Sequence, residues 1–248
     1  MSEETAARLH ALLAKARARH RAPEAPVAPA FPAEDPTVVE LVRSFLVWEA
    51  GESFASRALA SIQSSVVDLN ELRVFLPDEI VSMLGSEDAR AQERAERLRA
   101  CLNEVYAREH DIRLSHLGEE GKRDVRAYLD TLDGMHPFVA ARVSLLCFGA
   151  HAFPVDSRLR DALARARVVP AGQSPTDAGS WTERQIRAGE ALASYRALEA
   201  MVDAQAPRAP KAAKAPKRPA APRKPAVARS SKEGASRARS PRKPSSEK

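Results

Sequence analysis

The sequence predicts an all-α protein, and three observations support this prediction. Ala, Leu, Arg and Glu are abundant among the 248 residues, and residues with such side chains lose little rotamer freedom in a helix. Aromatic residues make up only 5% of the chain, and no stretch alternates apolar and polar residues as a half-buried strand does. Apolar residues recur at helical spacing instead, for example at Leu98, Cys101, Leu102 and Val105.

The expected helices follow one another along the chain after a short N-terminal one. Residues 2–21 form a first helix, with acidic residues at its start and basic residues at its end. Five prolines within the fifteen residues 22–36 then indicate an extended linker. Further helices are expected at residues 36–46, 53–64, 77–84, 86–110, 121–132 and 137–148, followed by one after Pro154 and a last one that ends near Val202.

Capping residues mark several of these boundaries. Asp35 can cap the first helix of the body, and Pro36 can open it. Gly85 can close the helix at residues 77–84. We expect a loop from Pro170 to Ser180, and the run from Ser180 to Glu183 has the form of a capping box that opens the last helix.

The charge is divided unequally along the chain. Residues 206–248 carry 14 Lys/Arg and 2 Glu, whereas the preceding residues carry 25 basic and 31 acidic side chains. The net charge of +6 thus combines a tail of +12 with a body of −6. Because the tail is rich in proline and has almost nothing large and apolar to bury, it is expected to be disordered. We therefore predict an N-terminal helix and Pro/Ala-rich linker at residues 1–35, a helical domain at 36–204 and a basic tail at 205–248.

The stretch from residue 129 to 159 contains the most informative motif. Apolar residues, a glycine and an alanine follow the spacing of a helix–hairpin–helix, at Leu129, Leu132, Gly134, Met135 and Ala140. The glycine permits a tight reversal, Met135 packs inward, and the second helix directs its free amides at a DNA phosphate. A contact of this kind positions a protein on a duplex without reading its sequence.

This stretch resembles the helix–hairpin–helix–GPD superfamily of base-excision DNA glycosylases, which includes endonuclease III. In that superfamily the hairpin leads to an apolar-Asp segment whose Asp serves the chemistry. Here the matching segment is Pro154-Val155-Asp156, eighteen positions beyond Phe138. The resemblance implies a glycosylase-like helical domain over about residues 36–202, duplex DNA as partner and Asp156 as the catalytic carboxylate.

The departures from the superfamily pattern are also informative. Phe138 stands where the bifunctional members carry the Lys that forms a Schiff base, so that position cannot supply the lyase nucleophile. The pair Pro137-Phe138 is similar to the Pro-aromatic pair of the alkyl-base glycosylases. His136 replaces the second glycine of the hairpin and Pro137 lacks an amide donor, so phosphate binding is weakened or reshaped, although His136 could itself contact a phosphate. No cysteine follows Cys147, so no iron–sulfur cluster and no other cofactor is expected.

Asp156 and Glu49 are the candidate catalytic residues. Asp156 is expected to stabilise the oxocarbenium-like sugar and to orient a water, and as an alternative it could be the N-cap of the next helix. The two roles are compatible. Glu49 could line the pocket, or it could be a solvated residue at a helix end. Asn70 and Glu71 could line the same cleft, but a polar turn is favoured for them.

Other side chains favour structural roles. Trp48 and Trp181 might stack on a base, but core positions are the commoner use of such residues. Cys101 and Cys147 are expected to be buried thiols. The histidines show no metal-ligand spacing with the cysteines, so no metal site is expected.

The basic tail resembles those of linker histones, and its Ser240-Pro241-Arg242-Lys243 resembles a minor-groove-binding element. The DNA-binding residues expected there are Lys211, Lys214, Lys217, Arg218, Arg223, Lys224, Arg242 and Lys243. Such residues bind phosphates through counterion release, and six contacts would give a salt slope of roughly −5. A solubilising role, or contact with RNA or a membrane surface, is the alternative. DNA is favoured because the body carries a DNA-type hairpin, at Gly134, Met135, His136 and Phe138.

These features lead to two hypotheses of function. The favoured one is a monofunctional DNA glycosylase that excises an altered or mispaired base through Asp156; the alternative is a non-catalytic DNA-binding or nucleoid/chromatin protein on a degenerate glycosylase fold. No apolar run approaches the length of a membrane span, and the first residues do not form a signal peptide. We expect a cytoplasmic, nucleoid-associated protein (nuclear in a eukaryote) without membrane contact, and nothing indicates an obligate oligomer.

Overall fold

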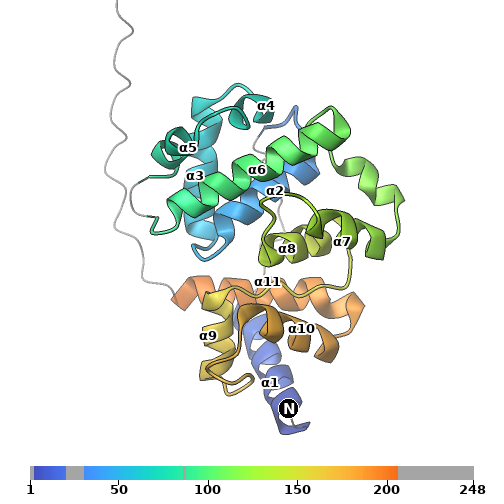
Figure 1. The fold of residues 1–248 in the computed structure, drawn as a ribbon. Helices are drawn as coiled ribbons and strands as arrows, with labels where there is room; N and C mark the ends of the chain where they lie inside the picture. Colours follow the sequence, from blue (N-terminus) through green and yellow to red (C-terminus); the bar gives the residue numbers. More distant parts are fainter. Residues whose placement is uncertain (1–2, 21–30, 86–87, 206–248) are drawn as a thin grey trace, which may run out of the picture. The chain divides into compact units, whose positions relative to one another are not determined.

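The computed structural model describes residues 3–20, 31–85 and 88–205. These residues form helices and no strand, which confirms the all-α prediction (Figure 1). The chain divides into two units, Met1–Pro207 and Arg208–Lys248, of which the second lies outside the described residues, as do the predicted DNA contacts of the tail. The elements are α1 (Glu3–Arg19), α2 (Pro36–Val47), α3 (Glu52–Ser65), α4 (Leu69–Leu72), α5 (Pro77–Leu84), α6 (Ala91–Glu109), the 3-10 helix η1 (Ser115–Glu119), α7 (Lys122–Asp130), α8 (Pro137–Phe148), α9 (Ser157–Arg165), α10 (Pro175–Gln185) and α11 (Ala188–Gln205).

A first hydrophobic core is built from α2 to α8. Its buried side chains run from Phe31 to Val143 in the sequence. Helix α2 begins as predicted, because the Asp35 carboxylate accepts hydrogen bonds from the backbone N–H groups of Thr37 and Val38 and Pro36 occupies the first turn. The same carboxylate accepts from the backbone N–H of Ser115, so it also ties the start of α2 to η1.

A second hydrophobic core is built from both ends of the body. It combines Leu9, Leu13 and Ala16 of α1 with apolar residues of α9, α10 and α11. Helix α1 packs against α11 (Figure 1). The N-terminal helix, which the sequence places in a segment of its own, is therefore part of the same compact unit as α11.

Helix α8 is shared by the two cores. Phe138, Val139 and Val143 belong to the first core, whereas Ala141 and Leu145 belong to the second. Its bounds, Pro137–Phe148, are those predicted from the sequence. A helix that is apolar around most of its circumference is buried on all sides, and here α8 lies where the two cores meet.

The expected start of the last helix at Ser180 is wrong. Helix α10 already begins at Pro175, where the Ser174 hydroxyl caps it by accepting from the backbone N–H of Asp177 at 3.1 Å. Ser180 lies inside this helix, and the break before α11 falls at Ile186 and Arg187. Gly179 lies inside the helix and does not end it. The glycine allows the backbone of Phe153 to pack closely against α10, because a Cβ at position 179 would lie 2.9 Å from the carbonyl oxygen of Phe153.

The segment around Asn70 is a single helical turn, in agreement with the polar turn favoured for it. Helix α4 is capped by Asp68, whose carboxylate accepts from the backbone N–H of Glu71. Asn70 accepts a hydrogen bond from Arg73, and the Glu71 carboxylate accepts from the backbone N–H of Val67. Both side chains thus stabilise their own turn.

Candidate functional site

The hairpin between α7 and α8 has the tight reversal expected from its glycine. Gly134 has φ +72°, in the left-handed region. A Cβ at Gly134 would lie 2.5 Å from the carbonyl oxygen of Arg97, so the hairpin also packs directly on the backbone of α6. Met135 is partly buried against the first core, as predicted. Glycine is needed here both for its φ and for this close approach.

His136 caps the second helix of the hairpin. Its Nδ1 accepts a hydrogen bond from the backbone N–H of Phe138 at 3.2 Å, and its ring stacks on Trp48 with the centroids 4.0 Å apart. Burial lowers the pKa of His136 to about 4, and the positive charge of Arg97 acts in the same direction. The imidazole is therefore neutral at pH 7, and because Nδ1 accepts, the ring proton is on Nε2.

Asp156 caps α9 and is almost completely buried, with 4% of its surface exposed. Its Oδ1 accepts from the backbone N–H of Leu159 at 2.8 Å, and its Oδ2 accepts from the backbone N–H of Glu49 at 3.2 Å. Burial raises the pKa of Asp156 to about 6, although the Leu159 N–H and the Arg158 guanidinium favour the charged form. The predicted N-cap role is confirmed, and the carboxylate is still mostly ionised at neutral pH.

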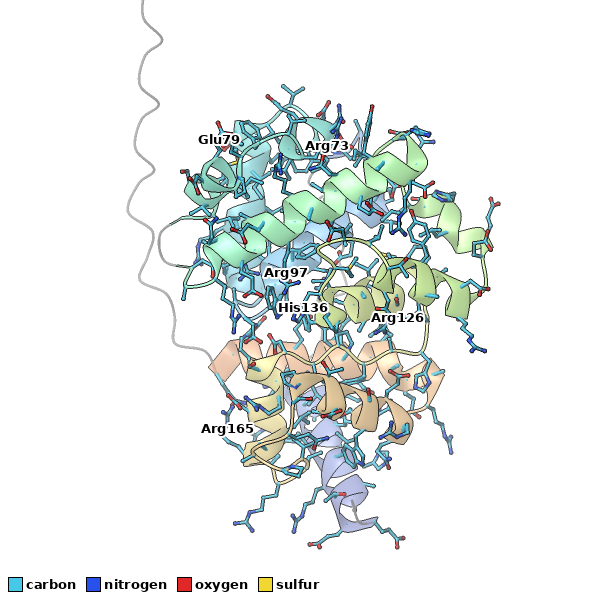
Figure 2. The ribbon with its side chains drawn as sticks, in the orientation of Figure 1. Arg73, Glu79, Arg97, Arg126, His136 and Arg165 are labelled. Carbon is cyan, nitrogen blue, oxygen red and sulfur yellow. The ribbon has the colours of Figure 1, made fainter. Side chains whose placement is uncertain are left out.

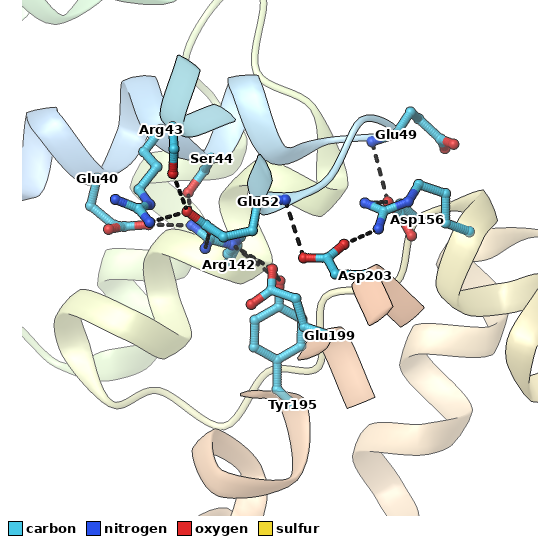
Figure 3. Close-up of polar contacts among 12 residues, drawn as sticks. Glu40, Arg43, Ser44, Glu49, Glu52, Arg142, Asp156, Tyr195, Glu199 and Asp203 are labelled. Carbon is cyan, nitrogen blue, oxygen red and sulfur yellow. Dashed lines mark hydrogen bonds and ion pairs between the residues drawn. The ribbon is translucent and has the colours of Figure 1, made fainter. Parts of the chain in front are cut away.

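Glu49 makes a reciprocal hydrogen bond to the backbone of the residue that follows Asp156. Its carboxylate accepts from the backbone N–H of Ser157 at 2.9 Å, and its backbone has φ +61° in the turn that follows α2. Asp156 binds the backbone of Glu49 (Figure 3), while Glu49 binds the backbone next to Asp156. The structure therefore brings the two candidate residues together at the start of α9; Glu49 is half-exposed just beyond the end of α2, and its carboxylate has a partner there.

Arg142, which the sequence analysis did not single out, is the centre of a buried polar joint between the two cores. It lies on α8 with 4% of its surface exposed. Its Nε donates to the Tyr195 hydroxyl at 3.1 Å, and its Nη1 contacts the Ser44 hydroxyl and the Glu40 carboxylate. Two further carboxylates lie near the guanidinium, that of Glu199 at 3.5 Å and that of Glu52 at 3.9 Å. Burial opposes the charge on Arg142, but Tyr195, Glu199 and Glu40 outweigh it and raise its pKa.

A second ion pair connects this joint to Asp156. Arg158 binds Asp203, and its guanidinium also lies 3.7 Å from the Asp156 carboxylate. Asp203 accepts from the backbone N–H of Glu52 at 3.2 Å (Figure 3). Gly51 makes room for this pair, because a Cβ there would lie 2.6 Å from the Asp203 carboxylate and 2.7 Å from the Arg158 guanidinium.

The space beside Asp156 is small. Phe138, Tyr195, Glu199 and Arg158 are among the residues that line a cavity of about 10 Å³ next to the Asp156 carboxylate. A cavity of that size holds at most one water molecule, whereas a pocket for a small organic ligand usually measures about 300 Å³ or more. Phe138 is buried and faces this cavity, so its side chain does not lie on the surface expected for a DNA contact.

The other aromatic and cysteine residues considered in the sequence analysis lie in or beside the hydrophobic cores. Trp48 and Trp181 are both buried, as favoured, in the first and second core respectively. Cys101 is buried, Cys147 is half-buried, and both are free thiols. In the three described ranges, no three His, Cys, Asp or Glu side chains gather as metal ligands. No helix within those ranges is long and apolar enough to cross a membrane.

The fold is that of the helix–hairpin–helix DNA glycosylases. An 8-oxoguanine glycosylase/lyase of Clostridium acetobutylicum, solved with double-stranded DNA, aligns over 82% of this chain and 70% of its own with a TM-score of 0.57 and 15% identity. A thermostable thymine-DNA glycosylase aligns over 84% and 92% with a TM-score of 0.52 and 17% identity. The 3-methyladenine DNA glycosylase of H. pylori, bound to 1,N6-ethenoadenine, covers 82% and 99% at a TM-score of 0.50 and 11% identity.

Comparison of the sequence with known proteins finds no relative. No protein-family model matches the chain, and no curated protein matches it. The resemblance predicted from the hairpin and the apolar-Asp segment is thus confirmed at the level of the fold, with strong divergence in sequence.

Proposed function

We propose that this protein binds duplex DNA and hydrolyses the N-glycosidic bond of an altered or mispaired base, with Asp156 as the catalytic carboxylate. The observation that carries the proposal is the placement of Asp156. It lies at the start of α9, at the junction of the two cores, and it lines one cavity together with Phe138 of the hairpin helix. The similarity of the fold to an 8-oxoguanine glycosylase/lyase and to a thymine-DNA glycosylase supports the same reaction class here.

The chemistry asked of Asp156 is electrostatic. Cleavage of the bond between base and sugar develops positive charge on the sugar, and a nearby carboxylate stabilises that charge and can orient the attacking water. The backbone N–H groups of Leu159 and Glu49 fix the orientation of the carboxylate. Its pKa of about 6 leaves it mostly ionised at pH 7, so it can act as a negative charge rather than as an acid.

A lyase step through a Schiff base is not part of this proposal. Phe138 occupies the position of the lyase Lys, and residues 1–205 contain only two lysines, Lys15 and Lys122. Lys15 is on α1, and the Lys122 ammonium donates to the carbonyl oxygen of Gly149. Hydrolysis through Asp156 also requires no cofactor, and two cysteines are too few for the four thiolates of an iron–sulfur cluster.

A second candidate function is DNA binding without base release. The cavity of about 10 Å³ beside Asp156 favours it, because a flipped base has no room there unless α9 or α11 moves. The side chains that fill this region are also firmly held: Tyr195 donates to Glu199 at 2.6 Å, and Arg142 donates to Tyr195.

One experiment separates the two candidates. The wild-type protein, Asp156→Asn and the control Asp161→Asn, an exposed position on the same helix, are incubated with duplexes that carry uracil, an alkylated purine or a mismatched adenine, and the strands are then treated with alkali. We expect abasic sites with the wild type and the control and a loss of at least a hundredfold with Asp156→Asn. Duplex binding without release from any lesion would overturn the enzyme and leave the binding function.

We further propose that the tail supplies sequence-independent DNA binding and keeps the protein on the nucleoid or chromatin. Its 14 Lys/Arg follow a body with a net charge of −6, which by itself repels a duplex. Removal of residues 206–248 should flatten the dependence of log K on log salt by several units. An unchanged slope would contradict the role of the tail.

A further inference from the structure

Several of the hairpin amides that would receive a phosphate are already used inside the protein. The N–H of Gly134 donates to the Asp133 carboxylate at 2.9 Å, and the N–H of Met135 donates to the carbonyl oxygen of Leu132 at 3.1 Å. The N–H of Phe138 donates to His136, and Pro137 has none. At these four positions a phosphate therefore finds no free amide, although a helix N-terminus usually offers several.

Two arginines, Arg90 at the N-cap of α6 and Arg97 within α6, lie beside this amide-poor end of α8. The guanidinium groups of Arg90 and Arg97 lie 5.3 Å and 5.9 Å from the centroid of the Trp48 ring, and that ring stacks on His136. The charges of both arginines contribute to the low pKa of His136, with that of Arg97 the larger. Arg97 and His136 lie close together in Figure 2, between α6 and the start of α8.

Glu93 holds the two arginines in place without hiding them. One of its carboxylate oxygens accepts from Arg90 at 2.8 Å and the other accepts from Arg97 at 3.1 Å. The side chains of Arg90 and Arg97 remain 46% and 36% exposed. The three residues carry a net charge of +1, and the Nε2–H of His136 is a neutral donor next to them.

Shielding of Trp48 alone does not require both arginines. Arg94, between them on α6, is fully buried, donates to the carbonyl oxygen of Trp48 at 2.8 Å and lies 5.7 Å from its ring. It therefore already fixes the end of α2 on α6. Arg90 and Arg97 keep exposed cationic groups on a half of the body that is otherwise acidic, since residues 34–156 contain 13 Lys/Arg and 22 Asp/Glu.

We propose that Arg90 and Arg97, positioned by Glu93 next to His136, bind a backbone phosphate of duplex DNA in place of the hairpin amides. The guanidinium group presents paired N–H donors that match phosphate oxygens. The inference rests on the DNA binding proposed above, but not on base release. It shifts the phosphate contact of the hairpin from the backbone of α8 to side chains of α6.

The test measures the binding of an undamaged duplex to the full chain by fluorescence anisotropy over a series of salt concentrations. The variants are Arg90→Gln, Arg97→Gln and the double variant. The control is Arg126→Gln on α7, where the arginine forms an ion pair with Asp130 one turn further along the helix. The double variant loses the contact with that phosphate, so its salt slope should be reduced by about one unit, while the control should keep the wild-type slope. A double variant that is less stable but has the wild-type slope would overturn the proposal.

Glu93→Gln tests the same site in the opposite direction. The amide oxygen of Gln can still accept from a guanidinium group and keep it in place, but the negative charge that competes with a phosphate is removed. Duplex affinity should therefore rise, and weaker binding would contradict the proposal. Because all of these measurements use undamaged DNA, they can succeed even if Asp156 releases no base. Base release with unchanged salt slopes would overturn the arginine site alone.

Discussion

The two helices that begin at the junction of the cores, α8 and α9, are capped by opposite chemistry. A neutral imidazole caps α8, and two exposed arginines stand beside it. Two carboxylates, those of Asp156 and Glu49, occupy the start of α9. A helix N-terminus attracts negative charge, so α9 has an internal anion where α8 leaves its surroundings positive. The comparison teaches that the same local feature, a helix N-terminus, can be occupied by internal carboxylates at one helix and lie beside cationic side chains at its neighbour.

Removal of Arg142 should have the largest effect, because it breaks the joint that holds α8 against α2 and α11. Arg142→Leu leaves the carboxylates of Glu40 and Glu199 without their buried partner. The loss of one partner of a buried ion pair costs roughly 3–5 kcal/mol. We expect urea unfolding at pH 7 to show a decrease of this size in the free energy of unfolding.

The ion pair between Arg126 and Asp130 at the surface serves as the control for that measurement. Arg126→Gln should change the free energy of unfolding by less than about 1 kcal/mol, as is usual for exposed pairs. If Arg142→Leu lowered the free energy of unfolding no more than this control does, the joint would not be what holds the starts of α8 and α9 in position.

The pH dependence of stability should separate the two caps by sign. Burial raises the pKa of Asp156 from 3.8 to about 6, so its contribution to stability is present below pH 4 and is lost as the pH rises through 6, by up to roughly 3 kcal/mol. Burial lowers the pKa of His136 from 6.5 to about 4, so its contribution is present above pH 6.5 and is lost as the pH falls through 4. The two slopes oppose each other in the same window.

Because the two pH dependences oppose each other in the wild type, two variants are needed to separate them. The free energy of unfolding is measured in urea from pH 4 to pH 7. Asp156→Asn should gain stability relative to the wild type as the pH rises. His136→Asn, which keeps a residue able to cap a helix, should lose less stability than the wild type on acidification. Parallel profiles for all three proteins would show that neither cap has the environment described here.

Glu49→Gln should have the smallest effect. The amide oxygen of Gln can still accept from the backbone N–H of Ser157, so the free energy of unfolding should change by no more than about 1 kcal/mol. The negative charge of Glu49 contributes to the raised pKa of Asp156, and the variant should therefore lower that pKa. An NMR titration of the Asp156 carboxyl group checks this, and an unchanged midpoint would contradict the coupling of the two carboxylates.

Local signals in the sequence predicted the parts of the fold that depend on neighbouring residues. The bounds of α8 follow from the Asp133-Gly134 turn, Pro137 in its first turn and Gly149 at its end. The start of α10 was missed because Pro175 and Gly179 were interpreted as loop residues. Proline is favoured in the first turn of a helix, and Gly179 is explained only by the backbone of Phe153, which packs against it.

The candidate site could be predicted only in part for a related reason. The spacing from the hairpin located Asp156, but the contact with Glu49 joins residues more than a hundred positions apart. The joint at Arg142 likewise depends on partners from α2 and α11. An arginine in the apolar run of α8 was a visible signal that such partners exist, because a buried charge must be paired, yet periodicity does not identify them.

The packing of α1 on α11 has a consequence for how the protein is made. The residues of the first core, from Phe31 to Val143, are contiguous in the chain and can assemble as soon as they have left the ribosome. Leu9, Leu13 and Ala16 of α1 are synthesised before them, but their partners on α11 are the last of the described residues to emerge. Helix α1 precedes the other described helices in synthesis but is thus among the last of them to find its partners, and its apolar face stays without α11 until that helix has been made.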